Sequence, residues 1–261
     1  MEVTILGCGP SYGIPTARFG FGDCNPNNPK NFRTRPSILV SDEGCNILID
    51  TPPELRMQLY NSNVQHVDAV IWTHMHADHT MGIDDVRIYT RTQVTIGDEV
   101  EPLPVYIHEK DWNEFQQRFS FYLQPFKYLK QPVAPFDAHL IRAGEVFNIK
   151  NMEILPILQN HTSCQTLGFK IKNFAYNTDL IDFINFNPAD LKGIDLWILD
   201  CVTTRPNDKH IYLDKAIELF NIVQPKRMVL THLGAKMDYD TISAQLPKGI
   251  ELAYDGMKIS V

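Results

Sequence analysis

The sequence predicts an α/β protein built as a four-layer αββα sandwich, in which two mixed sheets pack together and helices cover their outer faces. Two observations support this fold class. Short apolar runs bounded by turn residues occur in both halves of the chain and are typical of buried strands. Segments with apolar residues at helical spacing lie between them, of which residues 213–223 are the clearest. No repeat and no shift in composition divides the chain, so we expect one domain over residues 1–261.

The N-terminal half opens with an expected strand that runs into a glycine-rich turn over residues 7–15. Further apolar runs follow, and the last of them is a short buried strand. The expected strands are residues 3–6, 37–40, 46–49 and 68–72. A helix is expected over residues 53–60, because proline lies in its first turn, and another from Asp78 onward.

The C-terminal half repeats this alternation and ends in two short strands. The expected strands before them are residues 154–158, 167–171, 174–176, 196–199 and 228–230, with helices at 213–223 and from Asp240. Residues 98–136 stand apart because they are rich in aromatics, and Phe115, Phe119 and Tyr122 share one helical face. Core packing explains such rings most simply, and a lid over the site or a dimer surface is the sharper alternative.

The composition excludes several classes of protein. The 261 residues carry 24 Lys and Arg against 31 Asp and Glu, a formal charge of −7, and 44% are apolar, as in a folded globular protein. The acidic balance disfavours broad nucleic-acid binding. No apolar run reaches ~18 residues, the start has no secretory pattern, and the five scattered cysteines form no C-x-x-C pair. We therefore expect a cytoplasmic protein with no membrane partner.

The most informative stretch follows directly on the strand at residues 68–72. His74 and His76 are two positions apart, so an extended chain turns both to one side, and Asp78 and His79 follow at the start of a helix. Imidazoles and carboxylates suit a borderline cation such as Zn²⁺, and the mixture also admits Mn²⁺. Four ligands in six residues fit two adjacent ions better than one, with the first pair on one ion and the second pair on the other.

Each ion then needs further ligands, and three residues lie at the ends of expected strands. His161 follows residues 154–158, Asp179 follows 174–176, and His232 follows 228–230. We expect His161 to complete the first site and His232 the second. Asp179 is the natural bridge between the ions, because a carboxylate has two oxygens. The sequence thus predicts two divalent ions, Zn²⁺ or Mn²⁺, as cofactors.

At this point the sequence resembles the metallo-β-lactamase superfamily, whose signature H-x-H-x-D-H is met by His74 to His79. The downstream His161, Asp179 and His232 stand in the family's order. Within the superfamily the chain is most similar to the PhnP-like phosphodiesterase branch. The resemblance implies an αββα fold and a dinuclear site that hydrolyses small or cyclic phosphodiesters by attack of a metal-bridging hydroxide. We expect Asp78 to orient the hydroxide as well as to bind metal.

His210 lies just before the helix at residues 213–223, where PhnP-like enzymes carry a histidine facing the scissile phosphate. The resemblance implies that it protonates the leaving oxygen or stabilises the charged transition state. The relatives' usual Pro-His-Pro-Thr-His differs here, because Asn207, Asp208 and Lys209 intervene. PhnP carries clustered cysteines near its N-terminus that hold a structural zinc. The corresponding stretch here has only Cys24, and one thiolate cannot form such a site, so we expect no structural zinc there. Arg33 and Arg35 nearby are either phosphate contacts or solvated loop charges.

Three other functions stay open. An RNA phosphodiesterase of tRNase Z type would keep the chemistry, but the chain shows no basic, glycine-rich arm to recruit RNA. A thioester or lactam hydrolase of the same superfamily would leave His210 without a role. A metal-stabilised binding protein without turnover would need neither the full ligand set nor His210. A homodimer is open as well.

Overall fold

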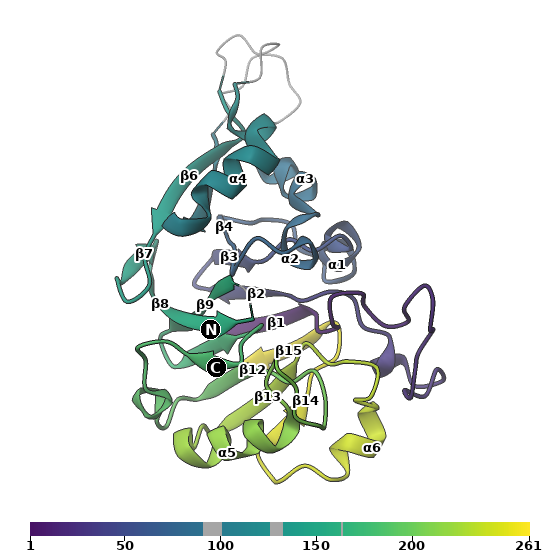
Figure 1. The fold of residues 1–261 in the computed structure, drawn as a ribbon. Coiled ribbons are helices and arrows are strands. Elements are labelled where there is room, and N and C mark those ends of the chain that lie inside the picture. The colour runs from purple at the N-terminus through teal and green to yellow at the C-terminus, as the bar shows by residue number, and fades with distance from the viewer. Residues whose placement is uncertain (91–100, 126–132, 163) are drawn as a thin grey trace.

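Two β-sheets face each other at the centre of the molecule, and helices lie on their outer sides (Figure 1). The computed structural model describes residues 1–90, 101–125, 133–162 and 164–261. The first sheet runs in the order β15 (Met257–Ser260), β1 (Glu2–Gly7), β2 (Ser37–Asp42), β3 (Cys45–Ile49), β4 (Ala69–Ile71), β5 (Leu103–His108) and β6 (Phe136–Ile141).

The second sheet comes mainly from the C-terminal half of the chain. Its order is β11 (Asp182–Phe183), β8 (Met152–His161), β9 (Cys164–Ile171), β10 (Phe174–Asn177), β12 (Leu196–Asp200), β13 (Arg227–Thr231) and β14 (Ile250–Leu252), and β7 (Phe147–Ile149) also pairs with β8. The interface between the sheets holds the larger apolar core. This arrangement confirms the predicted α/β fold of αββα type.

Alternating side chains explain why the inner strands β2, β3 and β4 of the first sheet are buried on both faces. In β2, Ile38 and Val40 point into the core between the sheets, whereas Leu39 points to the helical side. In β4, Ile71 and Val70 divide in the same way. Successive side chains of a strand point to opposite faces, and here each face packs into a different apolar core. These strands are therefore continuous apolar runs in the sequence.

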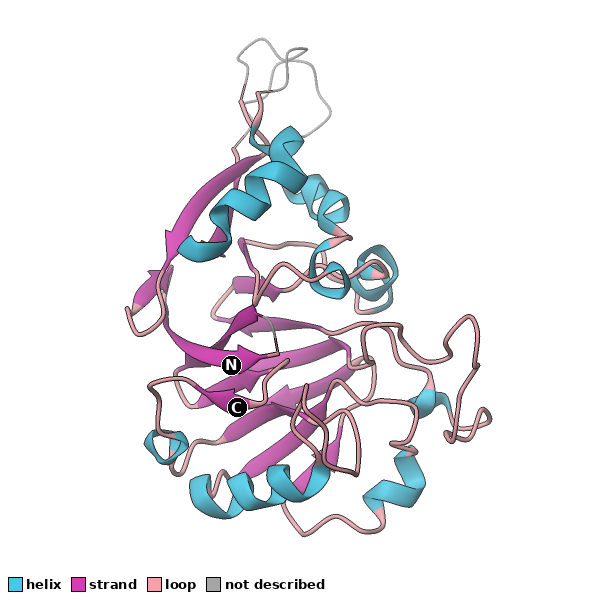
Figure 2. Cartoon of the chain, in the orientation of Figure 1, coloured by secondary structure: helices cyan, strands magenta, loops and turns pink. Residues whose placement is uncertain are grey.

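The helices form the two outer layers, as Figure 2 shows. Those over the first sheet are α1 (Leu55–Asn61), α2 (Ala77–Thr80), α3 (Ile83–Val86) and α4 (Trp112–Phe119), with short 3₁₀ turns η2 (Arg87–Tyr89), η3 (Glu109–Asp111) and η4 (Ser120–Leu123). Those on the far side of the second sheet are α5 (Leu213–Val223) and α6 (Tyr239–Ser243). Two further 3₁₀ turns are η1 (Pro29–Asn31) and η5 (Pro188–Leu191).

Parallel pairing decides where the functional side chains meet. In the second sheet β10, β12 and β13 run parallel, so their carboxyl ends meet at one edge. In the first sheet β3 and β4 are parallel as well. Residues that directly follow these strands are therefore brought to one region of the molecule, where loops rather than helices leave room for a site.

Most of the predicted elements are present, with shifted ends. The helix expected from Asp78 is broken into α2 and α3, and β5, β6, β7 and β11 were not predicted. Within residues 98–136, Phe115 and Phe119 of α4 are buried in the core under the first sheet, as expected for core packing. The aromatic residues Phe126 and Tyr128 lie outside the described residues. No helix in the described part of the chain is long and apolar enough to cross a membrane.

Candidate metal centre

The first ligand-type side chains lie on the loop between β4 and α2. His76 stands just before α2 with extended backbone angles, φ −64° and ψ 153°. Because the chain is extended here, His74 and His76 point to one side, and their ring centroids are 4.4 Å apart. Asp78 and His79 follow within the single turn of α2. The loop thus presents all four side chains to the edge where the second sheet's strands end.

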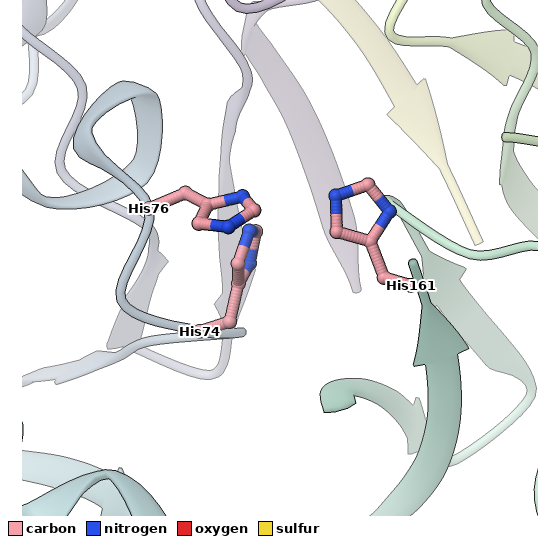
Figure 3. A group of neighbouring side chains, drawn as sticks. All are labelled: His74, His76 and His161. Carbon is pink, nitrogen blue, oxygen red and sulfur yellow. The ribbon is translucent and has the colours of Figure 1, made fainter. Parts of the chain in front are cut away.

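Three of the predicted residues form what we call cluster one: His74, His76 and His161. Their ligand nitrogens lie within 4.8 Å of one another. Figure 3 shows His74 and His76 on one side and His161, from the end of β8, facing them across a common space. His74 and His161 are buried, whereas His76 is exposed. Cluster one therefore joins two distant parts of the chain, one from each sheet.

The other four predicted residues form what we call cluster two: Asp78, His79, Asp179 and His232. One ligand atom from each lies within 4.8 Å of the others, and all four side chains are buried. Asp179 follows β10 and His232 follows β13, as the strand-end argument predicted. The structure therefore brings together all seven residues that the sequence singled out for metal binding.

Asp179 lies between the two clusters. Its Oδ2 atom is 3.1 Å from His79 Nε2, and its Oδ1 atom is 3.5 Å from His232 Nε2. The same Oδ1 is 3.7 Å from Nε2 of His161, in cluster one. Asp179 and His232 both have left-handed backbones, with φ of 53° and 58°. Non-glycine residues adopt that conformation rarely and at a cost, and such strain is concentrated at functional sites.

The polar atoms of this region fit a bound cation. Buried polar atoms in proteins nearly always have a hydrogen-bond partner, and each exception calls for an explanation. Four ligand atoms at the clusters have no hydrogen-bond partner among the described residues: His74 Nε2, Asp78 Oδ2, His79 Nε2 and His232 Nε2. Asp78 Oδ2, His79 Nε2 and His232 Nε2 belong to cluster two, where one divalent cation would satisfy them together, and a second cation in cluster one would satisfy His74 Nε2.

The protonation of cluster one suits metal binding at neutral pH. Burial and the neighbouring His79 hold the pKa of His74 well below its usual range, and burial also lowers the pKa of His161. Both imidazoles are therefore neutral, which is the form that binds metal. His161 donates from Nδ1 to the Lys209 carbonyl at 3.0 Å, and this fixes the ring with Nε2 free.

Cluster two is charged instead. Burial alone would lower the pKa of His79, but three carboxylates outweigh it and raise that pKa well above its usual value. Burial would likewise raise the pKa of Asp179, but His232 and His79 keep it well below its usual range. One proton on His79 thus offsets part of a concentrated negative charge. A divalent cation would take the place of that proton and offset more of the charge.

A carboxylate that the sequence analysis missed orients His79. Asp50 follows β3 and is fully buried, and its Oδ2 accepts from His79 Nδ1 at 2.7 Å. It also accepts from the Thr73 backbone N–H at 2.8 Å and from the Thr73 hydroxyl. The carboxylate–histidine contact fixes the tautomer of His79 and leaves Nε2 toward the cluster.

His210 lies beside both clusters, as predicted. Its ring stacks on His232 with centroids 4.9 Å apart and is 4.8 Å from the ring of His161. Its Nδ1 donates to Oδ2 of Asp200 at 2.9 Å. Burial lowers the pKa of His210, but the charge and hydrogen bond of Asp200 outweigh it and raise that pKa to about 9. His210 therefore carries a proton at neutral pH.

The residues that interrupt the relatives' pattern hold His210 in place. The Asn207 side-chain oxygen accepts from the backbone N–H groups of Lys209 and His210, at 2.9 and 2.8 Å. The carbonyl of Lys209 in turn accepts from His161. The loop is thus tied to a cluster-one ligand, so its altered sequence still delivers His210 to the site.

The N-terminal loop contributes structure rather than phosphate contacts. Arg33 is 1% exposed and donates to the carbonyls of Leu233 and Met237, which clamps the loop after His232. Arg35 pairs with Glu54 at 2.6 Å. Both guanidinium groups are engaged within the protein, so the alternative of phosphate contacts was wrong for Arg33. Cys24 is buried, and its thiol contacts the Ala235 carbonyl at 3.5 Å.

Asp50 and Asp200 were missed although the sequence carried a signal for them. Asp50 directly follows the expected strand at residues 46–49, and Asp200 directly follows the one at residues 196–199. Asp179 and His232 also follow expected strands. They were predicted because they can bind a metal directly, whereas Asp50 and Asp200 contact histidines instead.

A family model described as Beta-lactamase superfamily domain matches residues 45–233. These residues are more than half of the chain and include cluster one, cluster two and His210. The chain belongs to the metallo-β-lactamase superfamily. Proteins of this superfamily are hydrolases that normally bind divalent metals, and the two clusters provide the ligands for them.

Three known proteins refine this assignment. A solved diphosphatase of the PhnP family is 29% identical, with a TM-score of 0.88 over 100% of this chain and 97% of its own, which confirms the resemblance to the PhnP-like branch. Zn²⁺-bound PqqB from Methylobacterium extorquens is 17% identical and shares the fold, with a TM-score of 0.78 and complete coverage of both chains. An octanoyltransferase of Porphyromonas gingivalis is 28% identical over 99% of this chain. The matched region is only 51% of the length of that octanoyltransferase.

Proposed function

We propose that this metallo-β-lactamase-fold protein is a dinuclear metal-dependent phosphodiesterase that hydrolyses small or cyclic phosphodiesters. The observation that carries the proposal is the position of the protonated His210 beside ligands of both clusters. A metal-stabilised binding protein would have no use for a buried proton donor at that position. The similarity to a PhnP-family diphosphatase supports cleavage of a phosphorus–oxygen bond.

The ligand sets divide the cofactors between the clusters. His74, His76 and His161 would hold one divalent ion, and Asp78, His79 and His232 the other, with Asp179 in reach of both. Two such ions, Zn²⁺ or Mn²⁺, would supply Lewis acidity toward the phosphoryl oxygens and toward the attacking water. The chain as a whole is acidic, so the ions are also what makes the site attractive to an anionic substrate.

The side chains of the protein then handle the protons. A phosphodiester and water give a phosphomonoester and an alcohol, so the alcohol oxygen must gain a proton as its bond to phosphorus breaks. His210 can supply that proton from Nε2, because Nδ1 is already bonded to Asp200. Asp78 Oδ2 has no hydrogen-bond partner among the described residues, and Asp78 would orient the attacking water.

A first experiment tests this division of labour. Metal-loaded protein should hydrolyse bis(p-nitrophenyl) phosphate or a 2′,3′-cyclic nucleotide, and a chelator should abolish the activity. His210→Ala should lower kcat by ~10²–10⁴-fold, the usual contribution of a positioned acid, with metal content unchanged. Equal activity of the variant on the cyclic nucleotide, whose leaving group is a poor one, would contradict the role of His210. A precursor tRNA as the far better substrate would favour the RNA phosphodiesterase instead.

A second candidate function is hydrolysis of an acyl thioester, and one specific observation favours it. The octanoyltransferase that resembles this chain acts on an acyl group by its name, although half of that protein lies outside the similarity. A thiolate leaves without a proton donor, since its conjugate thiol has a pKa of about 8.5. Octanoyl thioester turnover that survives His210→Ala, together with no phosphodiester turnover, would establish this function over the first.

A further inference from the structure

The outer edge of β6 is the feature from which we infer a partner. β6 pairs with β5 in parallel register, with Tyr106 opposite His139. Within residues 1–90, 101–125, 133–162 and 164–261, no strand pairs with its other edge. Figure 1 shows β6 at the rim of the molecule, with α4 on one face of the sheet rather than beside the strand. A free edge is a template for another strand unless the protein blocks it.

The backbone directions along β6 follow from one hydrogen bond. The Pro135 carbonyl accepts from the Leu103 N–H at 2.8 Å, so the peptide groups of Pro135 point to β5. Because directions alternate along a strand, Asp137 and His139 also point to β5. The N–H and C=O groups of Phe136, Ala138 and Leu140 therefore point away from the sheet and are available to a new strand.

The side chains show that this edge is exposed and not blocked. Leu140 is 49% exposed, a large apolar residue beside an open edge. Asp137 and His139 point to the opposite face, and their side chains are 59% and 45% exposed. Within one chain, Nε2 of His139 lies 3.0 Å from Oδ2 of Asp137. From Phe136 to Ile141 the edge carries no lysine and no proline, and the Asp137 carboxylate, the one charged group of the kind that can block an edge, is paired with His139.

The sequence of β6 is complementary to itself in one antiparallel register. With the two-fold axis at Ala138, the outward groups of Ala138 face their own copies and those of Phe136 face Leu140 of the other copy. Asp137 then lies opposite His139 of the other copy, twice by symmetry. Shifting the register by two residues in either direction places Asp137 or His139 opposite itself, so both Asp137–His139 contacts between the copies are lost. An imidazole N–H can donate to a carboxylate across the strands, whereas two carboxylates opposite each other oppose pairing.

We propose that two copies of this chain associate through antiparallel pairing of β6 about an axis at Ala138. The pairing joins the first sheets of the two protomers into one continuous sheet. It covers Leu140 with Phe136 of the other copy and turns the Asp137–His139 contact of one chain into a network of four side chains. The contact is isologous, so it closes at two copies.

The test measures the oligomeric state of the full chain by sedimentation velocity over a range of concentrations. The wild-type protein should be a dimer. His139→Asp places like charges in opposition and should weaken the dimer by roughly tenfold or more. The double swap Asp137→His with His139→Asp restores a histidine opposite each carboxylate and should recover the dimer. Lys258→Asp on β15, the other outer strand of the same sheet, is the matched control and should change nothing.

A second variant tests the geometry independently of charge. Ala138→Cys places a thiol on the two-fold axis, so mild oxidation should give a disulfide-linked dimer on a non-reducing gel. Glu153→Cys, an exposed position on β8, should give no such band. A monomer at every concentration would overturn the proposal, and so would a dimer that is indifferent to His139→Asp and to the double swap.

Discussion

The two ligand clusters differ in charge, exposure and support, although Asp179 reaches both. Cluster one consists of three imidazoles and no carboxylate, and its His76 is exposed. Cluster two combines two carboxylates with two histidines, and all four side chains are buried. Asp50 accepts a hydrogen bond from His79 on the side away from the cluster, whereas the ring nitrogens of His76 have one hydrogen-bond partner among the described residues, the Cys164 thiol at 3.8 Å.

The difference indicates a division of tasks within one site. A buried, carboxylate-rich set concentrates negative charge and holds a divalent cation firmly, whereas neutral ligands with one exposed member bind more loosely. We therefore expect cluster two to hold a divalent ion more firmly than cluster one. The following predictions test this contrast, beginning with the residue that the halves share.

Asp179→Ala should have the largest effect, because it removes a carboxylate within reach of ligands in both clusters. We expect bound metal to fall from about two ions per chain to less than one, and kcat/KM to fall by ~10³-fold or more. Elemental analysis of the same sample used for kinetics measures both. Asp182→Ala, an exposed carboxylate on β11, is the control and should keep both values.

Asp50→Asn should weaken cluster two more than cluster one, because Asp50 contacts His79 directly and reaches His74 only through the Thr73 hydroxyl. The amide cannot replace the negative charge beside His79 Nδ1, and loss of such an orienting partner lowers metal affinity by ~10–100-fold. Competition with a chromophoric chelator should show one strongly weakened ion and one that changes much less. Equal weakening of both would contradict the separation of the two clusters.

The pH dependence tests the Asp200–His210 pair. Since Asp200 helps to raise the pKa of His210 to about 9, phosphodiester hydrolysis should decline as pH rises through about 9. In Asp200→Asn only burial and more distant carboxylates remain, so the decline should move to lower pH. A raised pKa adds stability that is fully present below the ordinary value near 6.5 and is lost as pH rises through about 9. The stability difference between wild type and variant should therefore shrink across that window, which denaturant titration at several pH values measures.

Cys164→Ser should have the smallest effect. The thiol contacts His76 and the His161 carbonyl, but it does not share a ligand cluster with either. Metal content should be unchanged, and kcat/KM should stay within about threefold of the wild type, as for most substitutions outside a key contact. A loss of one bound ion would instead make Cys164 a ligand of cluster one.

The sequence predicted the ligands better than their surroundings. Metal ligands must be particular residue types at strand ends, so His74, His161 and His232 could be found from composition and position alone. Asp50 and Asp200 act through a histidine, and only the folded structure shows which histidine a carboxylate contacts. Their roles therefore could not be read from the chain.

The same limit applies to the fold. Runs such as residues 68–72 are apolar throughout and are easily recognised as buried strands. β5 contains Pro104, which lacks an N–H, and β6 carries charged residues on one face, so neither shows the pattern of a buried strand. These two segments form strands because they pair with their neighbours in the sheet, not because of a local apolar pattern. β6 is also the strand whose free edge suggests a partner.

The most direct test of the central claim is a crystal structure of the metal-loaded protein with anomalous scattering measured at the absorption edge of the bound metal. We expect two anomalous peaks, both within reach of Asp179. One should lie among His74, His76 and His161, and the other among Asp78, His79 and His232. A single peak, or a peak away from these residues, would contradict it.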